Sequence, residues 1–313
     1  MPLQPRRLSS HATAGCLHTS LCITLDLTIE SQGILNRASA GRWKVNPEAK
    51  RNVLDSFRLD GKVGLVTGAG SGLGRAFAEA LAEAGADVAC VDIKPDTAQD
   101  TVELVRELGR AGHAIGADVS DERAVDSAFR QAEEALGPLD VVFANAGVAG
   151  EAGDLEETTL SGWQEVIDVD LTGTYLTVRA AAGSMVPRGY GKIVTTASLY
   201  GLRGDPLFGI YGYTAAKSGV VGLTRSAAIN LGPKGIRINA IAPGYIRTQI
   251  AGGHMFSNDP EAVRLRETIV ERTPLGRVGD PEDLKGLAVF LASPASDYCT
   301  GWTFAVDGGW LAS

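Results

Sequence analysis

The sequence has no excess of positive charge and no apolar run long enough to cross a membrane. Its 313 residues include 29 Lys and Arg against 37 Asp and Glu, which gives a formal net charge of −8. Nucleic acids and anionic membranes are bound mainly through clustered basic side chains, so neither is expected as a partner. The longest suspect run, residues 21–29, is far shorter than a bilayer requires and contains Asp26.

Cysteine and histidine are also scarce, with four residues of each. The cysteines are widely separated and form no CxxC pair: Cys16, Cys22, Cys90 and Cys299. This distribution excludes a disulfide-rich scaffold and favours a reducing compartment, so we expect a cytoplasmic protein. The histidines lack the spacing of metal ligands, so no metal site is expected.

The first 56 residues differ from the rest in charge and in pattern. They hold seven basic and four acidic residues, a net charge of +3, which leaves −11 for residues 57–313. They show no sustained period of a helix or a strand, so we predict a poorly ordered extension over 1–56. Three interpretations remain open: a dispensable extension or wrongly assigned start, an organelle transit peptide, or a segment with its own function.

From residue 57 onward, short apolar runs alternate with stretches of helical spacing. The predicted strands cover residues 63–67, 87–91, 114–117, 139–144, 192–197, 236–241 and 303–306. The predicted helices cover residues 73–84, 95–109, 121–136, 160–186, 211–231 and 281–291. Because the strands are apolar on both faces, they are typical of a buried parallel sheet. We therefore predict one α/β domain over 57–313, with a doubly wound, Rossmann-like, mostly parallel sheet.

Glycine is abundant, with 39 residues, and several glycines follow the first predicted strand in Thr67-Gly-Ala-Gly-Ser-Gly-Leu-Gly74. Gly68, Gly72 and Gly74 allow a sharp turn and a close approach of the backbone to a pyrophosphate. The helix that follows offers free N–H groups and the positive end of its dipole. This pattern predicts a dinucleotide site; the alternative is a glycine-rich turn without a ligand.

Asp92 ends the second predicted strand, 18 residues after Gly74. A carboxylate there accepts hydrogen bonds from the adenosine ribose and repels a 2′-phosphate, so it favours NAD over NADP. Ser71 stands before Gly72, where an Arg or Lys would favour NADP, and so it also points to NAD. Lys94 works against this prediction, because its positive charge favours NADP. The alternative interpretation of Asp92 is a surface aspartate at the start of a loop.

Together with later motifs, these residues resemble the short-chain dehydrogenase/reductase family, in its single-domain branch of about 250 residues. The resemblance covers roughly residues 59–312 and rests on motifs in the family's order: Thr67-Gly68, Gly72-Leu-Gly74, Asn145-Ala-Gly147, Ser198, Tyr213-Thr-Ala-Ala-Lys217 and Pro243-Gly-Tyr-Ile-Arg-Thr248. The longer branch of the family normally has GxxGxxG and fits poorly. The resemblance implies a nicotinamide cofactor and a homotetramer built through the helices at 160–186 and 211–231.

Tyr213 and Lys217 are four residues apart in a predicted helix and so share one face. Tyrosine, with an ordinary pKa of about 10, is a poor base unless a nearby cation stabilises its phenolate. Ser198 follows a predicted strand at the edge where such sheets bind ligands, and its hydroxyl can orient a substrate oxygen. Tyr211 has Ala215 four residues later and is the weaker candidate. The alternative is that none of the three is catalytic: Tyr213 and Lys217 would then be an exposed pair on a helix surface, and Ser198 an ordinary loop serine.

The resemblance also implies which residues contact the cofactor. These are Gly68, Ser71, Gly72, Leu73, Gly74, Asp92, Asp118, Val119, Asn145, Ala146, Gly147, Tyr213, Lys217, Pro243, Gly244, Ile246 and Thr248. From the residues alone, Asp118 has the alternative role of a cap for the following helix. Asn145-Ala-Gly147 has the alternative role of a turn that ends a buried strand.

One position departs from the family pattern. The run Val169-Asp-Leu-Thr-Gly173 has Asp170 where the family usually has an Asn that helps to hold a water for proton relay to the lysine. An ionised Asp170 near Lys217 favours the charged lysine. Our hypothesis is that Asp170 still supports this proton relay, and a tolerated substitution is the alternative.

These motifs together predict an NAD(P)-dependent oxidoreductase that interconverts a secondary alcohol and a ketone, with NAD preferred. Relatives that end in a run like Val306-Asp-Gly-Gly-Trp310 often act on polyols, sugars or sugar acids, so the resemblance favours such a small-molecule substrate. The segment between Thr248 and Pro274 is predicted to be flexible and to cover the substrate, beside a long loop at 202–210. Two other functions remain open: a 3-oxoacyl-type reductase and a non-catalytic, dinucleotide-binding sensor.

Overall fold

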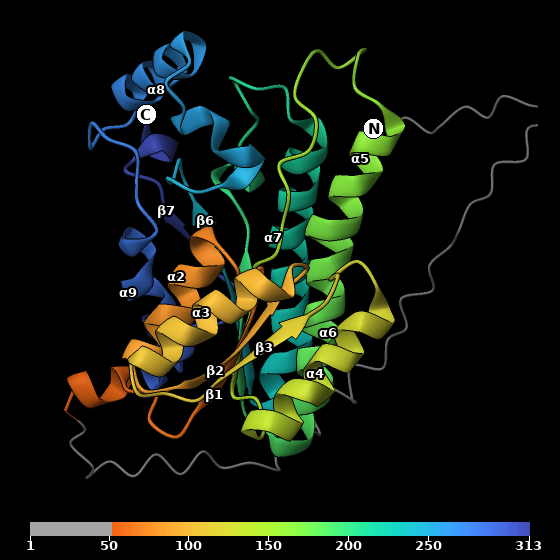
Figure 1. Ribbon diagram of the computed structural model, residues 1–313, viewed down its shortest axis with the longest axis vertical. Coiled ribbons are helices and arrows are strands. Elements are labelled where there is room, and N and C mark those ends of the chain that lie inside the picture. The colour runs from red at the N-terminus through yellow and green to blue at the C-terminus, as the bar shows by residue number, and fades with distance from the viewer. Residues whose placement is uncertain (1–51) are drawn as a thin grey trace, which may run out of the picture. The chain divides into compact units, whose positions relative to one another are not determined.

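Seven parallel strands form one sheet in residues 52–313, the part of the chain that the computed structural model describes. Their order across the sheet is β3-β2-β1-β4-β5-β6-β7, and every neighbouring pair is parallel (Figure 1). The strands are β1 Val63–Thr67, β2 Asp87–Asp92, β3 Gly112–Gly116, β4 Val141–Ala144, β5 Gly191–Thr196, β6 Ile236–Pro243 and β7 Thr303–Val306. The prediction of a doubly wound parallel sheet is confirmed.

Helices cover both faces of this sheet and bury two apolar cores against it (Figure 1). On one face lie α2 Gly72–Glu83, α3 Pro95–Glu107 and α9 Glu282–Ala292. On the other lie α4 Glu122–Leu136, α6 Thr174–Met185 and α7 Tyr211–Leu231. Adjacent residues of β1 show why its apolar run is continuous: Leu65 packs into one core and Val66 into the other.

The predicted extension over 1–56 lies outside the described residues except for its last five positions. A 3-10 helix, Leu54–Phe57, begins within these positions, and the Phe57 ring packs 6.3 Å from the ring of Phe290 on α9. The other 3-10 helices are Val186–Arg188, Leu199–Gly201, Gly232–Lys234, Ile250–Phe256, Pro294–Ser296 and Trp310–Ala312. No helix of residues 52–313 is long and apolar enough to cross a membrane.

The helix predicted over 160–186 is present and contains a π-helical turn. It consists of α5 Leu160–Val166, a π-helical turn Ile167–Gly173 and α6. The wider turn is stabilised at its end by the Thr174 hydroxyl, which donates to the carbonyl oxygen of Asp170 at 2.7 Å. Such π-turns are rare and often occur at functional sites. Here the turn carries Asp170.

The segment predicted to be flexible, 248–274, contains the 3-10 helix Ile250–Phe256 and the helix α8 Pro260–Arg272. Asp259 caps α8 by accepting a hydrogen bond from the Glu261 N–H at 2.8 Å, and Pro260 occupies the first helical position. Two of its residues are buried, Ala262 and Ile269. Capping and this short apolar contact make the segment largely helical, and its role as a cover for the substrate stays a prediction.

The order of the strands reverses between β1 and β4, which leaves a crevice at the carboxyl ends of the strands. β1 ends at Thr67, β2 at Asp92, β5 at Thr196 and β6 at Pro243. Most of the predicted site residues follow these strand ends directly. The topology therefore brings together residues that are far apart in the sequence.

Candidate active site

Tyr213 and Lys217 lie one turn apart near the start of α7, as their spacing predicts. The Lys217 Nζ atom lies 5.3 Å from the centre of the Tyr213 ring. Lys217 is only 3% exposed, and its Nζ donates to the carbonyl oxygen of Thr196 at 3.0 Å. The same atom lies 3.0 Å from Asp170 Oδ2. The ammonium is thus fixed between the tyrosine, the end of β5 and the π-turn.

Asp170 is fully buried, and both of its oxygens have a defined position. Oδ2 pairs with Lys217, and Oδ1 accepts a hydrogen bond from the Val148 N–H at 2.8 Å. A Cβ atom at Gly147 would lie 2.8 Å from Oδ2, so this carboxylate requires a glycine there. The π-turn therefore places a charged group where it holds both Lys217 and the loop after β4.

Burial and charge act in opposite directions on the pKa values of Lys217 and Tyr213. Burial lowers the pKa of Lys217, but the Asp170 charge and the Tyr213 phenol together outweigh it, so the pKa is raised. Burial raises the pKa of Tyr213 more than the Lys217 charge lowers it, and Asp170 raises it further. The predicted effect of Lys217 on Tyr213 is present, but burial outweighs it, and the pKa of Tyr213 lies above its ordinary value.

Ser198 follows β5 and is buried beside Tyr213. Its hydroxyl hydrogen-bonds the Tyr213 side chain, which lowers the pKa of Tyr213. Its Oγ also accepts a hydrogen bond from the Tyr200 N–H at 3.2 Å, which fixes the rotamer. Ser198, Tyr213, Lys217 and Asp170 thus form one contiguous polar cluster, named the Tyr213 group below.

The glycine-rich turn forms a cradle at the start of α2. Gly68 and Gly72 have positive φ angles of 65° and 52°, a conformation that favours glycine. A Cβ atom at Gly74 would lie 1.9 Å from the carbonyl oxygen of Gly68, so no side chain fits there. Ser71 precedes α2 without capping it through its side chain, so the first N–H groups of the helix have no side-chain acceptor. These features suit a phosphate group.

Asp92 lies next to this cradle at the end of β2. Its Oδ2 accepts a hydrogen bond from the Gly70 N–H at 2.9 Å, and its Oδ1 accepts one from the Lys94 N–H at 3.0 Å. Each oxygen keeps a lone pair for a further donor. The carboxylate is therefore held beside the turn by two backbone N–H groups.

Asn145 joins three strand ends. Its Nδ2 donates to the Thr67 carbonyl oxygen at 3.0 Å, and its Oδ1 accepts from the Thr196 hydroxyl at 3.1 Å. The Thr67 hydroxyl accepts hydrogen bonds from the backbone N–H groups of Asn145 and Ala146. The side chain of Thr67 was not among the predicted site residues; its signal is a threonine directly before the glycine cluster.

Asp118 and Val119 follow β3. Asp118 Oδ1 accepts hydrogen bonds from the Ser120 N–H at 2.9 Å and the Ser120 hydroxyl at 2.7 Å. The cap of α4 is Asp121, so the alternative role of Asp118 as that cap is wrong. Val119 is buried against Gly173 at the end of the π-turn, where a Cβ atom would lie 2.7 Å from it.

The segment after β6 closes the other side of the crevice. A Cβ atom at Gly244 would lie 2.6 Å from the Cα atom of Asp307, so the backbone passes close to the C-terminal strand. Ile246 is buried. A Cβ atom at Gly72 would lie 3.3 Å from the Thr248 side chain, which brings this segment against the glycine cradle. Leu73 packs into the core and contributes its backbone to the cradle.

Comparisons with known proteins agree with this geometry. A family model described as Enoyl-(Acyl carrier protein) reductase matches residues 68–311. Cyclohexanol dehydrogenase of Acinetobacter sp. (strain SE19) is 37% identical over 257 residues, which cover 82% of this chain and 98% of that relative.

Two solved structures extend the comparison. A short-chain type dehydrogenase/reductase from Mycobacterium marinum has a TM-score of 0.78 and 36% identity, and the match covers 84% of this chain and all of that one. A gluconate 5-dehydrogenase from Burkholderia cenocepacia J2315, in complex with NADP and tartrate, has a TM-score of 0.77 and 34% identity, with 84% and 100% covered. The chain belongs to the short-chain dehydrogenase/reductase family and is an oxidoreductase that uses a nicotinamide dinucleotide.

Proposed function

We propose that the protein oxidises a secondary alcohol to a ketone, and reduces the ketone in the reverse direction, with NAD as its preferred cofactor. The observation that carries this proposal is the Tyr213 group, which lies at the carboxyl edge of the sheet, where the glycine cradle also opens. A buried hydroxyl, an ammonium and a second hydroxyl within contact of one another suit proton exchange with a substrate alcohol.

Each member of the Tyr213 group has a distinct role in this proposal. Tyr213 accepts the proton of the substrate hydroxyl through its phenolate oxygen. Ser198 hydrogen-bonds the substrate oxygen as its charge changes. The Lys217 ammonium favours the phenolate form of Tyr213. When bound, the nicotinamide supplies the hydride acceptor or donor.

Asp170 acts as a positioning residue in this proposal. It holds the ammonium together with the Thr196 carbonyl group and fixes the loop after β4 through Val148. The substitution of the family's usual Asn by Asp keeps the acceptor for Val148 and adds a negative charge. Asp170 thereby supports the charged state of Lys217 while it opposes ionisation of Tyr213.

The glycine cradle and the strand ends are proposed to hold the cofactor. Gly68, Ser71, Gly72, Leu73 and Gly74 offer backbone to the pyrophosphate. The remaining contacts are proposed for Asp92, Asp118, Val119, Asn145, Ala146, Gly147, Tyr213, Lys217, Pro243, Gly244, Ile246 and Thr248. The close approach of backbone segments in this crevice supports the assignment, because a Cβ atom at most of its glycines would collide with a neighbour.

Asp92 gives the cofactor preference a direct test. Wild-type enzyme is expected to have a higher kcat/KM with NAD than with NADP, because the fixed carboxylate repels a 2′-phosphate. Asp92→Asn keeps an acceptor but removes the charge, so the NAD to NADP ratio of kcat/KM is expected to fall about tenfold, as a change of about 1.4 kcal/mol would give. Asp96→Asn, at an exposed position on α3, is the control and is expected to leave the ratio unchanged. A wild-type preference for NADP would refute the proposal.

The substrate is proposed to be a polyol, a sugar or a sugar acid. The C-terminal run Val306-Asp-Gly-Gly-Trp310 supports this class, as does the similarity to a gluconate 5-dehydrogenase. The test is a spectrophotometric panel of polyols, sugar acids, cyclic alcohols and 3-oxoacyl thioesters with both cofactors. Turnover of the polyols or sugar acids with NAD supports the proposal. Turnover of the thioesters alone indicates a 3-oxoacyl reductase, and tight NAD binding without turnover indicates a sensor.

The protein is also proposed to form a homo-oligomer, a tetramer by family resemblance. Several apolar side chains are exposed on the helices that the resemblance assigns to the interface, α5, α6 and α7. They include Leu160 (81% exposed), Trp163, Tyr175 and Ile229 (80% exposed). Large apolar side chains that are exposed on the surface commonly take part in a protein interface.

A cytoplasmic location is proposed as well. Cys90 and Cys299 are free thiols, and burial raises the pKa of Cys90 to about 12. Free thiols of this kind suit a reducing compartment. The interpretations of residues 1–51, the transit peptide among them, lie outside the described residues.

A further inference from the structure

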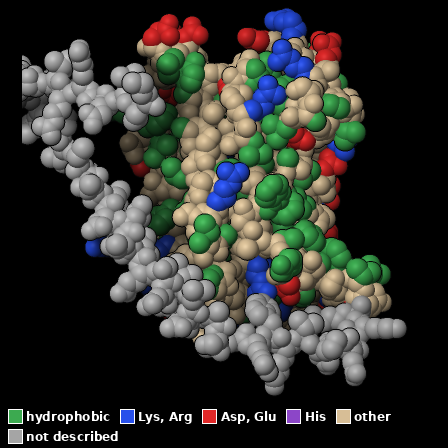
Figure 2. Space-filling view, turned by 180° about the vertical axis from the view of Figure 1, so that it is seen from behind, with side chains coloured by type: hydrophobic (Ala, Val, Ile, Leu, Met, Phe, Trp, Pro, Cys, Tyr) green, Lys and Arg blue, Asp and Glu red, His purple; other side chains and the backbone are tan. Residues whose placement is uncertain are grey.

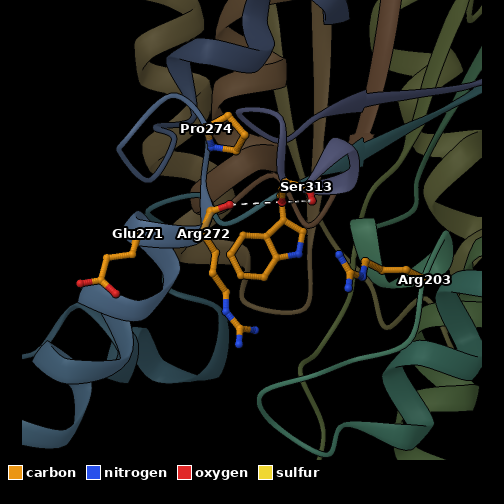
Figure 3. Close-up of a pocket in the computed structure, with 6 residues that line it drawn as sticks. Arg203, Glu271, Arg272, Pro274 and Ser313 are labelled. Carbon is orange, nitrogen blue, oxygen red and sulfur yellow. Dashed lines mark hydrogen bonds between the residues drawn. The ribbon is translucent and has the colours of Figure 1, made fainter.

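Two arginines line a cavity of about 450 Å³ that lies apart from the glycine cradle and from the Tyr213 group (Figure 3). The lining residues are Arg203, Glu271, Arg272, Pro274, Trp310 and Ser313. The buried and hydrogen-bonded Tyr200 and Tyr245 separate this cavity from the reacting hydroxyls. Figure 2 shows Lys and Arg side chains at the end of the molecule where α8 lies. A different arginine, Arg75, contacts the glycine cradle itself.

Arg75 lies in the first turn of α2, directly after Gly74. Its Nη2 atom donates to the carbonyl oxygen of Gly70 at 2.6 Å, and its Nε atom donates to the hydroxyl oxygen of Thr101 on α3 at 3.2 Å. Within residues 52–313 it forms no ion pair with an acid. The guanidinium group therefore uses its donors to fasten the cradle to two helices.

A directed chain of hydrogen bonds runs from Arg75 to Asp92. The Thr101 hydroxyl, which accepts from Arg75, donates in turn to the carbonyl oxygen of Ala69 at 2.8 Å. This carbonyl group and the N–H of Gly70 belong to the same peptide unit, and that N–H donates to Asp92 Oδ2 at 2.9 Å. Each donor points the same way along the chain, so each bond polarises the next. The chain ends on the carboxylate that is proposed to face the ribose.

The geometry at Gly70 explains why the carboxylate needs this support. A Cβ atom at Gly70 would lie 2.8 Å from Asp92 Oδ2, so only a glycine lets the backbone pass this close. Glycine has the widest choice of backbone angles, so its orientation depends on bonds from outside. The Thr101 hydroxyl fixes the peptide unit before Gly70, and the Arg75 guanidinium fixes the carbonyl group after it.

We propose that Arg75 is a positioning residue for cofactor selection. Through Thr101 and the Ala69–Gly70 peptide unit it fixes the Asp92 carboxylate where this group excludes a 2′-phosphate, and so it increases the preference for NAD over NADP. The inference rests on the proposed function and adds to it a residue that acts on the cofactor only through Asp92.

The test is a double-mutant cycle on cofactor selectivity. Selectivity is measured as the ratio of kcat/KM with NAD to that with NADP, and as the corresponding ratio of Kd values by calorimetry without substrate. Arg75→Met keeps the length of the side chain and removes its donors, so the ratio is expected to fall about threefold to tenfold. Because Arg75 acts through the charge of Asp92, the double variant with Asp92→Asn is expected to match Asp92→Asn alone, at about tenfold. Independent effects would multiply to about thirtyfold or more.

Three further variants separate positioning from a general loss of structure. Arg75→Lys keeps a donor for the Gly70 carbonyl group and is expected to recover part of the selectivity. Thr101→Val breaks the chain but leaves the guanidinium charge, and it is expected to lower the ratio as Arg75→Met does. The control is Arg106→Met, because Arg106 is exposed on α3 and donates to the carbonyl oxygen of Gly112 at 3.2 Å, at the start of β3. It is expected to leave the ratio unchanged, and the unfolding midpoint of every variant is measured alongside.

The outcomes distinguish this inference from the proposed function. If wild type prefers NADP but the effects of Arg75→Met and Asp92→Asn are not multiplicative, the positioning role stands and the proposed NAD preference fails. If wild type prefers NAD and the effects multiply, the preference stands and the positioning role is wrong. If Arg75→Met raises the ratio, the guanidinium group meets the 2′-phosphate directly, and the positioning role is wrong as well.

Discussion

Replacement of Tyr213 by Phe is expected to lower kcat for alcohol oxidation about a thousandfold, the range in which a positioned acid–base group contributes. The substitution removes only the hydroxyl that exchanges a proton with the substrate. The ring, the Lys217–Asp170 pair and the glycine cradle keep their contacts. NAD binding and the unfolding midpoint are therefore expected to change little. The measurement is steady-state oxidation, with NAD binding followed by calorimetry.

Tyr211→Phe provides the matched control on the same helix. Tyr211 is exposed, has Ala215 four residues later and has no lysine beside it. This variant is expected to keep wild-type activity within about threefold, as surface substitutions usually do. Activity of Tyr213→Phe within tenfold of wild type would show that another group accepts the proton, and the assignment of Tyr213 would be wrong.

The fold was predictable because its strands carry the simplest pattern in the chain. β1 and its neighbours are apolar on both faces, and the alternation with amphipathic helices leaves few arrangements other than a doubly wound sheet. The candidate site was predictable for a related reason. Its residues follow strand ends, and in a parallel sheet these ends meet at one edge. Gly74, Asn145 and Ser198 are placed together by topology alone.

The parts that were missed depend on contacts without a local pattern. α8 buries only Ala262 and Ile269, so its apolar stripe is too weak to mark a helix. The π-turn keeps the composition of a helix and differs only in its hydrogen bonds, which periodicity does not detect. Arg203 and Arg272 are 69 positions apart, and only the packing of α8 on the C-terminal segment brings them to one cavity.

The electrostatic prediction for Tyr213 was incomplete because the depth of burial has no sequence signal. Lys217 was expected to lower the pKa of Tyr213, and its charge does so. Burial acts in the other direction and is larger, and Asp170 adds to it. The pKa of Tyr213 is therefore raised first by burial and further by Asp170, the position where this chain departs from the family pattern.

Replacement of Asp170 by Ala is expected to destabilise the protein by about 3 kcal/mol at neutral pH, because it leaves a buried ammonium without its counter-charge. It also removes the acceptor of the Val148 N–H. The raised pKa of Lys217 means that the pair contributes fully below the ordinary lysine pKa of about 10.4, and that its contribution is lost as the pH rises through the folded value. Urea unfolding is therefore expected to show a gap between wild type and variant that narrows in alkaline solution.

Asp170→Asn separates the charge of Asp170 from its shape. Asn keeps an acceptor for the Val148 N–H. The Asp170→Asn variant is therefore expected to be more stable than Asp170→Ala and to have a higher maximal kcat. Oxidation requires the Tyr213 phenolate, so its rate falls as the pH falls through the pKa of Tyr213. Asp170 raises that pKa, and its neutralisation is expected to move the acid limb of kcat to lower pH. An unchanged acid limb, with Ala and Asn variants equally stable, would show that the carboxylate neither tunes Tyr213 nor stabilises Lys217.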